Sequence, residues 1–365
     1  MPQTTLAIGL MSGTSLDGVD AALIETDGEA LVRPVAFRGE DYSDAARAQL
    51  AEATTAALTY DTPRASPVIV AAADLIVRTH AFAVAKLLRQ AGVAAGDVGV
   101  IGFHGQTVAH RPDRGWTWQI GDGAALAAAT GIDVVADFRS ADVAAGGQGA
   151  PLLPVYHAAL AAGLGGPVAI LNLGGVANVT LVGAGELVAF DTGPANGLID
   201  SWVEAETGAR YDVGGQLAAA GQVHANVLDA MLDHPFFDQP APKSLDRADF
   251  TIQPARGLSA ADGAATLTAF TAATVACALD QLPVRPARLL VAGGGRRNPV
   301  MLAMIAEQTG LTPEPAEALG WNGDAIEAEG FAYMAVRSLR GLPISFLGTT
   351  GAPRPLTGGT LHRAG

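Results

Sequence analysis

The sequence has little cysteine and little positive charge. Its 365 residues include one cysteine, Cys277, which excludes an intramolecular disulfide and is typical of a reducing cytoplasm. The neighbours of Cys277 are apolar, so we expect an inert, buried thiol rather than a nucleophile. The chain carries 22 lysines and arginines against 36 aspartates and glutamates, a formal net charge of −14. Nucleic acid is therefore disfavoured as a partner, because there is no basic excess to displace its counterions.

Several signatures of phosphate binding, catalysis and targeting are missing as well. The two lysines, Lys86 and Lys243, lie outside any G-x-x-x-x-G-K-[ST] pattern, which excludes a P-loop. There is no G-x-S-x-G elbow and no H-R-D catalytic loop. Charge, glycine or proline interrupts every apolar stretch of 18 residues, so no membrane span is expected. The N-terminus has neither a basic region nor a cleavage site, so export is not expected.

What is present is enough apolar sequence for two well-packed domains. A length of 365 residues exceeds one ordinary core, and 49% apolar against 16% charged residues indicates a globular protein. Strand and helix patterns alternate, which predicts the α/β class. We expect an N-terminal domain of residues 1–140 plus 345–365 and a C-terminal domain of residues 141–344.

The expected elements repeat once along the chain. Strands are expected at 6–11, 19–24, 30–38, 98–103, 133–136, 168–173, 176–182, 187–191 and 286–292. Helices are expected at 43–58, 67–91, 122–129, 151–161, 197–207, 216–232, 259–282, 299–308 and 323–339. A strand, a glycine turn and two further strands open each half. This internal repeat is typical of the duplicated actin-like ATPase (ribonuclease H-like) fold, in which two domains flank an active-site cleft.

The first glycine turn is the most informative stretch of the chain. It joins two apolar strands and supplies small residues, hydroxyls and one carboxylate between them: Ser12, Gly13, Thr14, Ser15, Leu16, Asp17 and Gly18. Main-chain N–H groups and hydroxyls in such a turn can face an anion, and Asp17 suits a divalent cation between protein and phosphate. The alternative is an ordinary surface hairpin, in which Gly, Ser and Asp are common.

Two further glycine turns lie in the second half. One contains Gly174, Gly175 and Asn178, and the other contains Gly293, Gly294, Gly295 and Asn298. We predict nucleotide contacts for both, with the triple glycine leaving room for a flat base or ribose. The alternatives are a plain hairpin turn for the first, a helix cap for Asn298 and a solvated charge for Arg296 or Arg297.

Asp191 is the candidate catalytic group. It follows an apolar strand and precedes Thr-Gly-Pro-Ala-Asn196, so its carboxylate can act as a general base that activates an attacking oxygen. Phosphoryl transfer needs positioning, charge neutralisation and such a base. The alternative is an Asx turn that caps the next helix.

Other polar side chains are weaker candidates on their own. His104 and Gln106 follow a short buried strand, and His104 with His110 lacks the third partner of a metal site. Arg139 lies between two acids, which suits either a local ion pair or a clamp for a substrate carboxylate. Glu327 opens the last helix, where an acid also suits the helix dipole.

Taken together, the motifs resemble the anhydro-N-acetylmuramic acid kinases. The resemblance is carried by Gly9-Leu-Met-Ser-Gly-Thr-Ser-Leu-Asp-Gly-Val-Asp20, Phe103-His-Gly-Gln-Thr107, Ala144-Ala-Gly-Gly-Gln-Gly-Ala-Pro151, Phe190-Asp-Thr-Gly-Pro-Ala-Asn196 and Asp324-Ala-Ile-Glu-Ala-Glu-Gly-Phe-Ala-Tyr333. It covers nearly the whole chain, with two departures: Ala195 stands where a glycine is expected, and the tail after Thr349 fits less closely.

The resemblance implies a reaction and roles for these residues. The family converts 1,6-anhydro-N-acetylmuramic acid, ATP and water to N-acetylmuramic acid 6-phosphate and ADP, in peptidoglycan recycling in the bacterial cytoplasm, usually as a homodimer. Asp191 would be the base, residues 13–20 would hold the ATP phosphates, and Asp17 would contact Mg²⁺. His104, Gln106, Arg139, Asn196 and Glu327 are the predicted substrate contacts. Two alternatives remain: a levoglucosan kinase, or a non-catalytic actin-like ATPase.

Overall fold

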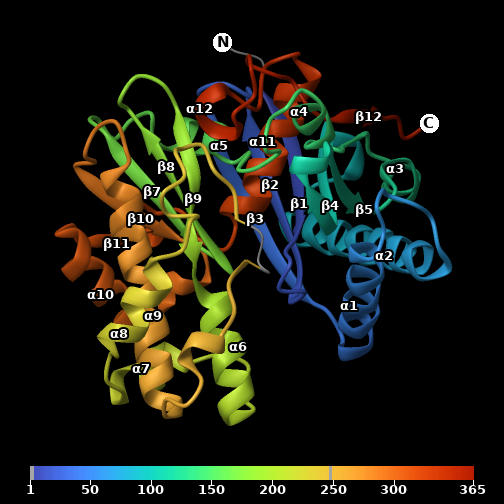
Figure 1. Ribbon diagram of the computed structural model, residues 1–365. Helices are drawn as coiled ribbons and strands as arrows, with labels where there is room; N and C mark the ends of the chain where they lie inside the picture. The colour runs from blue at the N-terminus through green and yellow to red at the C-terminus, as the bar shows by residue number, and fades with distance from the viewer. Residues whose placement is uncertain (1–3, 246–248) are drawn as a thin grey trace. The chain divides into compact units, whose positions relative to one another are not determined.

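The computed structural model describes residues 4–245 and 249–365, which divide into two compact units (Figure 1). Unit 1 comprises Met1–Ala162 with Ala325–Gly365, and unit 2 comprises Gly163–Asp324. Compared with the expected boundaries, residues 141–162 and 325–344 therefore lie with unit 1. The reason is the last long helix, α11 (Ile326–Leu339), which packs on strands β1, β2 and β4 of unit 1.

Unit 1 is built on a mixed sheet in the order β12-β6-β4-β1-β2-β3, with β5 paired to β4. Its strands are β1 (Thr5–Ser12), β2 (Gly18–Thr26), β3 (Val32–Asp41), β4 (Val100–Arg111), β5 (Trp116–Ile120), β6 (Val134–Ala136) and β12 (Thr360–His362). Unit 2 has a sheet in the order β11-β10-β7-β8-β9. Its strands are β7 (Val168–Leu173), β8 (Val176–Val182), β9 (Val188–Pro194), β10 (Arg288–Ala292) and β11 (Pro313–Pro315).

The two sheets share one topology. In unit 1, β1 pairs antiparallel with β2, β2 antiparallel with β3, β1 parallel with β4, and β4 parallel with β6. In unit 2 the same four relations join β7 with β8, β8 with β9, β7 with β10, and β10 with β11. The predicted duplication is therefore confirmed, and the chain has the duplicated actin-like ATPase fold.

Helices flank these strands in both units. The α-helices are α1 (Asp44–Leu58), α2 (Pro67–Ala91), α3 (Gly123–Thr130), α4 (Ser140–Ala144), α5 (Pro154–Ala161), α6 (Asn196–Thr207), α7 (Gln216–Ala220), α8 (Ala225–Leu232), α9 (Ala260–Asp280), α10 (Pro299–Thr309), α11 and α12 (Leu347–Thr350). Short 3₁₀ turns are η1 (Ala95–Asp97), η2 (Pro112–Arg114), η3 (Val213–Gly215), η5 (Gln253–Ala255), η6 (Gly294–Arg297) and η7 (Ala316–Leu319).

Local sequence explains where many helices begin and end. Side-chain oxygens cap the first turns of α1, α2, α3, α9 and α10, from Ser43, Ser66, Asp122, Ser259 and Asn298. Left-handed glycines follow the last residues of α2, α3, α6 and α10, namely Gly92, Gly131, Gly208 and Gly310. These caps account for the close agreement between the expected and observed ends of these helices.

Glycines in the sheet bring α11 close to unit 1. A Cβ on Gly9 of β1 would lie 1.7 Å from the carbonyl oxygen of Ala328, and one on Gly102 of β4 would lie 2.0 Å from that of Phe331. Both positions therefore exclude any other residue while α11 keeps its place. This packing fixes the start of α11, where Glu327 lies.

Some expectations differ from the structure. Strand β4 runs through His104 and Gln106 rather than ending before them, because β5 pairs with its second half. Residues 216–232 form two helices, α7 and α8, since Gly221 is extended between them. No element is among those expected at residues 137–149 or after residue 345, whereas the structure has the short helix α4 and the strand β12 there. Strand β9 extends past Asp191 to Pro194, so Asp191 lies within a strand.

The expectation of a buried cysteine is wrong. Cys277 is exposed on α9, although the residues beside it along the helix are largely buried. Its thiol nevertheless has little thiolate character, because partial burial and the nearby Asp280 carboxylate raise its pKa.

Two helices are long and apolar enough to cross a bilayer by length and composition alone, namely α2 and α9. The apolar window of α9 is 83% buried among α6, α7, α8, α10 and β9. The window of α2 is 39% buried, and this helix packs on α1, α3, β2 and β3. Core helices of globular proteins pass the same test, so these two are weak evidence for a membrane span.

Candidate active site

The first glycine turn projects from the β1–β2 hairpin of unit 1. Leu16 N–H donates to the Gly13 carbonyl at 3.2 Å, which closes the turn, and Leu16 adopts a left-handed backbone with φ 58°. Thr14, Ser15 and Asp17 are exposed. A Cβ on Gly13 would meet no atom closer than 3.6 Å, so the space beside this glycine is open. The turn therefore has the open backbone and exposed hydroxyls expected of a phosphate-binding loop.

The far side of the same hairpin is less available to a ligand. Val19 is 1% exposed and belongs to the unit 1 core, so only its main chain can face a nucleotide. A Cβ on Gly18 would lie 2.3 Å from the Glu40 carbonyl oxygen, so this glycine is required by the neighbouring strand β3. Asp20, also on β2, is half-buried. Residues 18–20 thus support the hairpin structurally, and their predicted nucleotide contacts stay predictions.

Gln106 is tied to the base of this turn. Its side chain is fully buried, accepts a hydrogen bond from Ser12 Oγ at 2.5 Å and donates to the Gly13 carbonyl at 3.2 Å. Ser12 Oγ also bonds the Tyr42 hydroxyl at 2.8 Å, and Tyr42 N–H donates to the Asp17 carbonyl at 2.9 Å. This network holds both ends of the turn. Its contacts place Gln106 behind the turn, while its predicted role as a substrate contact stays a prediction.

His104 and Arg139 form a directed pair. His104 is buried, its Nδ1 donates to the Gly105 carbonyl at 2.8 Å, and its Nε2 accepts from Arg139 Nε at 3.1 Å and from Nη2 at 3.0 Å. Burial and the adjacent guanidinium hold the pKa of His104 well below its usual value, so the ring is neutral. Arg139 Nη1 also donates to the Gly149 carbonyl at 2.7 Å. The pair fixes a guanidinium in a defined orientation, as a carboxylate clamp requires.

Glu327 is half-buried at the start of α11. The carboxyl group of Glu329 holds this turn of the helix in place. Glu329, two residues on, is 3% exposed and accepts a hydrogen bond from the Tyr156 hydroxyl at 2.6 Å. Burial raises the pKa of Glu329, while the Tyr156 hydrogen bond lowers it in part. The hydrogen bond joins α5 to α11 and so fixes the helix turn that carries Glu327.

The second glycine turn joins β7 to β8 in unit 2. Asn196 at the start of α6 donates from Nδ2 to the carbonyls of Leu173 at 2.8 Å and Gly174 at 3.0 Å, and its own N–H donates to Gly174 at 3.0 Å. Gly175 is exposed, and a Cβ there would meet Gly197 Cα at an ordinary 4.0 Å. Asn196 thus holds this turn much as Gln106 holds the first. Its predicted substrate contact is untested.

The third glycine turn lies in η6, after β10. A Cβ on Gly294 would meet nothing closer than 3.9 Å, whereas one on Gly293 or Gly295 would collide with the end of β7 at 2.4 or 2.7 Å. Gly294 alone of the three is exposed and has room beside it. The Oδ1 of Asn298 accepts hydrogen bonds from the N–H groups of Val300 and Met301, both at 3.1 Å. Asn298 therefore caps helix α10, which is one of the two roles predicted for it from the sequence.

Arg296 braces this third turn from within unit 2. Its side chain is 4% exposed and pairs with Glu317 at 2.7 Å and Asp324 at 3.0 Å, and its Nη1 donates to the Gly293 carbonyl at 2.9 Å. Burial opposes the charge, but hydrogen bonds to Asp324 and Glu317 outweigh it and raise the pKa of Arg296. Arg297 is exposed and also contacts Asp324. Of the two arginines, Arg297 is the solvated one.

Asp191 lies on β9, the edge strand of the unit 2 sheet, opposite Asn178 of β8. A bulge between Ala177 and Asn178 interrupts the ladder beside it. Leu245 N–H donates to Asp191 Oδ2 at 2.8 Å, and Asp191 N–H donates to the Lys243 carbonyl at 3.0 Å. The half-buried carboxylate is therefore oriented by a main-chain donor, as a positioned general base needs.

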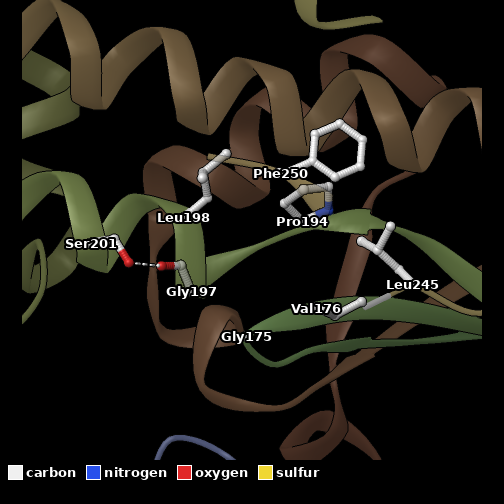
Figure 2. A pocket seen from close by; sticks show the side chains of 8 residues that line it. All are labelled: Gly175, Val176, Pro194, Gly197, Leu198, Ser201, Leu245 and Phe250. Carbon is white, nitrogen blue, oxygen red and sulfur yellow. Dashed lines mark hydrogen bonds between the residues drawn. The ribbon is translucent and has the colours of Figure 1, made fainter. Parts of the chain in front are cut away.

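Leu245 also lines a cavity of about 50 Å³ behind the second glycine turn. Figure 2 shows Leu245, Pro194, Leu198 and Phe250 around this space, and Ser201 donating to the Gly197 carbonyl at 2.8 Å. Its other lining residues are Gly175 and Val176. Leu245 therefore lines the same cavity as Gly175 of the turn and also orients the Asp191 carboxylate.

The first turn offers one oxygen ligand for a magnesium ion. Asp17 presents a carboxylate that is 75% exposed, and Arg47 Nη1 lies 3.9 Å from its Oδ1. Across residues 4–245 and 249–365, no group of three or more His, Cys, Asp or Glu could hold a metal. Magnesium bound through one carboxylate with waters and substrate phosphates needs no such group.

Sequence reasoning missed several residues that shape these sites. Tyr42 and Glu329 act through side-chain hydrogen bonds, and Leu245 acts through its main chain. For Lys243, the sequence indicates only that it is one of two lysines. No sequence pattern marks a main-chain donor such as Leu245.

Comparison with known proteins agrees with the motifs. Residues 5–364 match the family model described as anhydro-N-acetylmuramic acid kinase. Relatives with that name include one from Rhizorhabdus wittichii, 70% identical over 98% of this chain and 99% of its own, and one from Zymomonas mobilis, 56% identical over 98% and 99%. One from Rhodospirillum rubrum is 52% identical over 97% and 93%. The chain belongs to the anhydro-N-acetylmuramic acid kinase family and is a kinase.

Proposed function

We propose that this kinase opens the 1,6-anhydro ring of 1,6-anhydro-N-acetylmuramic acid with water and phosphorylates O6, giving N-acetylmuramic acid 6-phosphate and ADP for peptidoglycan recycling. The observation that carries the proposal is Asp191. Its carboxylate lies on an edge strand and is held by Leu245 N–H at 2.8 Å. Family membership supplies the substrate class.

The hydrolytic half of the reaction uses Asp191 as general base. The carboxylate takes a proton from a water molecule, whose oxygen forms a bond to the anomeric carbon C1. The bond between C1 and O6 breaks in the same displacement, as in an inverting glycosidase. The electron pair of that bond stays on O6, and the proton stays on Asp191 until solvent removes it.

The transfer half needs no second base. O6 leaves C1 as an oxyanion, attacks the γ-phosphorus of ATP and displaces ADP. The anhydro bridge holds this nucleophile in place before it is released, which removes much of the entropic cost of the second step. Gly13 to Asp20, Gly174, Gly175 and Asn178 hold the phosphates, and Gly293 to Gly295 with Asn298 hold the adenosine. Asp17 would hold a magnesium ion, which would neutralise charge on the phosphates.

Arg139 supports an acidic substrate. Its guanidinium is held by His104 and by the Gly149 carbonyl, and the family substrate carries a lactyl carboxylate that a guanidinium can bind through two hydrogen bonds. Glu327, His104 and Asn196 complete the proposed set of substrate-side residues, while Gln106 supports the first glycine turn through the Gly13 carbonyl. The same proposal, on the family resemblance, includes a homodimer in the cytoplasm that binds neither nucleic acid nor membrane.

The proposal is tested by Asp191→Asn in a coupled ADP-release assay with anhydromuramic acid. Turnover should fall about 10²–10⁴-fold while nucleotide binding is retained. Asp229→Asn, at an exposed acid on α8, is the control and should leave turnover unchanged. In ¹⁸O-water the label should enter C1 of the sugar. Label in the phosphate would mean simple ATP hydrolysis, as in an actin-like ATPase that phosphorylates no sugar. Turnover retained by Asp191→Asn would rule out Asp191 as the base.

A levoglucosan kinase is the second candidate, and Arg139 separates the two. Levoglucosan lacks the lactyl carboxylate, so Arg139→Met should raise KM for anhydromuramic acid and leave KM for levoglucosan unchanged. Higher kcat/KM for levoglucosan in the unaltered protein would favour the neutral sugar.

A further inference from the structure

The segment Lys243–Leu245 lies against the edge strand that carries Asp191. Asp191 N–H donates to the Lys243 carbonyl at 3.0 Å, and Leu245 N–H donates to Asp191 Oδ2 at 2.8 Å. β9 has β8 on one side and ends the sheet on the other. The segment therefore supplies both a main-chain partner for the strand and the donor that orients the carboxylate.

The Lys243 side chain anchors this segment. It is 6% exposed, and its Nζ donates to the carbonyls of Phe236 at 3.1 Å and Phe237 at 3.3 Å. The ammonium also lies 4.8 Å from the centre of the Phe236 ring and 5.9 Å from that of Phe190, the neighbour of Asp191. A buried ammonium is costly unless such acceptors and aromatic faces receive it, so its position is well defined.

Burial lowers the pKa of Lys243, whereas the nearby Cys277 of α9 and Asp238 oppose this change. The side chain points away from solvent and toward main-chain carbonyls, which leaves it unsuited to bind ATP phosphates directly. Its function has to be exerted through the segment that it holds.

We propose that Lys243 is a positioning residue for the general base Asp191. The inference rests on the proposed function, because it assumes that Asp191 activates the attacking water. Any residue at position 245 other than proline carries an N–H group, so the donor is present whatever the side chain there. The Lys243 anchor, two residues earlier, holds the segment that carries this donor. Without the anchor, the carboxylate loses its fixed orientation toward the attacking water. A small misplacement of a catalytic group lowers the reaction rate considerably.

The test compares four variants of the full chain with anhydromuramic acid and ATP. Lys243→Met keeps the length of the side chain and removes its donors, so kcat should fall about 10- to 100-fold while KM for both substrates stays within about twofold. Lys243→Arg keeps the cation and its donors and should recover most of the activity. Leu245→Pro removes the donor itself and should reproduce the loss of kcat. Lys86→Met, at the other lysine, is the control and should behave as the unaltered protein.

Asp191→Asn in the same series separates the two proposals. If Asp191→Asn keeps its turnover, the proposed function fails and the loss in Lys243→Met has another cause. If Asp191→Asn is inactive and Lys243→Met keeps its kcat, the positioning role is overturned. The positioning role is also overturned if kcat falls as much in Lys243→Arg as in Lys243→Met. It is overturned as well if KM rises in Lys243→Met while kcat falls, because a general structural defect predicts both results. Should Lys243→Met not fold, Lys243→Gln, which removes the charge and shortens the side chain, is judged by the same criteria.

Discussion

The side-chain amide of Gln106 donates a hydrogen bond to the carbonyl oxygen of Gly13 at 3.2 Å. Asn196 makes the same kind of contact in unit 2, from Nδ2 to the Gly174 carbonyl at 3.0 Å. Gln106 lies on β4, whereas Asn196 follows β9, so these are not equivalent positions of the duplicated fold. Each amide donates to the carbonyl oxygen of the first glycine of its turn and so holds that end of the turn in place.

Gln106→Leu should therefore weaken nucleotide binding more than sugar binding. The change removes the hydrogen bonds to Ser12 and Gly13, each worth about 1 kcal/mol, so KM for ATP should rise roughly 5- to 30-fold. Steady-state kinetics with each substrate varied in turn would measure it. Gln90→Leu, at a solvent-exposed glutamine of α2 in the same unit, should change neither constant. A rise confined to KM for the sugar would instead favour the direct substrate contact predicted from the sequence.

Gly294→Ala should separate ligand binding from folding. A Cβ there would meet nothing closer than 3.9 Å, so the free energy of unfolding should be unchanged within about 0.5 kcal/mol. KM for ATP should nevertheless rise several-fold if the base or ribose lies against this backbone. Gly295→Ala is the contrasting variant, because its Cβ would lie 2.7 Å from Leu173 Cβ and should lower the midpoint of urea unfolding. Unchanged KM for ATP in Gly294→Ala would place the adenosine elsewhere.

The parts of the structure that were predictable depend on short-range pattern. Apolar runs beside glycines located both hairpins, and their repetition gave the duplicated fold. The hydrogen bonds that shape the turns were not predictable, because they join residues far apart: 93 positions separate Gln106 from Gly13, and 54 separate Leu245 from Asp191. The burial of Cys277 was predicted wrongly from short-range pattern. Apolar neighbours along the chain do not bury a residue that faces outward on its helix.

The stability of unit 1 should fall as the pH decreases from about 7 to 5. Burial lowers the pKa of His80 and His157 to about 4, and burial with Arg139 lowers that of His104. Unfolded histidines bind protons near pH 6.5, so below that pH the unfolded chain holds protons that the native chain excludes. Each such histidine contributes about 1.4 kcal/mol of lost stability per pH unit between the two pKa values.

His80→Leu provides the measurement for this pH dependence. Urea unfolding of the variant and the unaltered protein at several pH values should show a slope smaller by about 1.4 kcal/mol per pH unit in the variant. Carboxylates contribute equally to both proteins and cancel in the difference. Identical slopes would mean that His80 is protonated in the native state or already protected in the unfolded one.

Arg296→Met should destabilise unit 2 and loosen the third glycine turn together. The guanidinium is 4% exposed and joins Glu317, Asp324 and the Gly293 carbonyl, so its removal leaves two carboxylates without their shared cation. Breaking a fully buried pair costs about 3–5 kcal/mol, and the partial exposure of both acids reduces the expected loss to about 2–3 kcal/mol. Arg297→Met removes an exposed cation from the same turn and should cost less than about 1 kcal/mol. Urea unfolding monitored by circular dichroism would measure both losses, and equal losses would show that the buried arginine does not brace the turn.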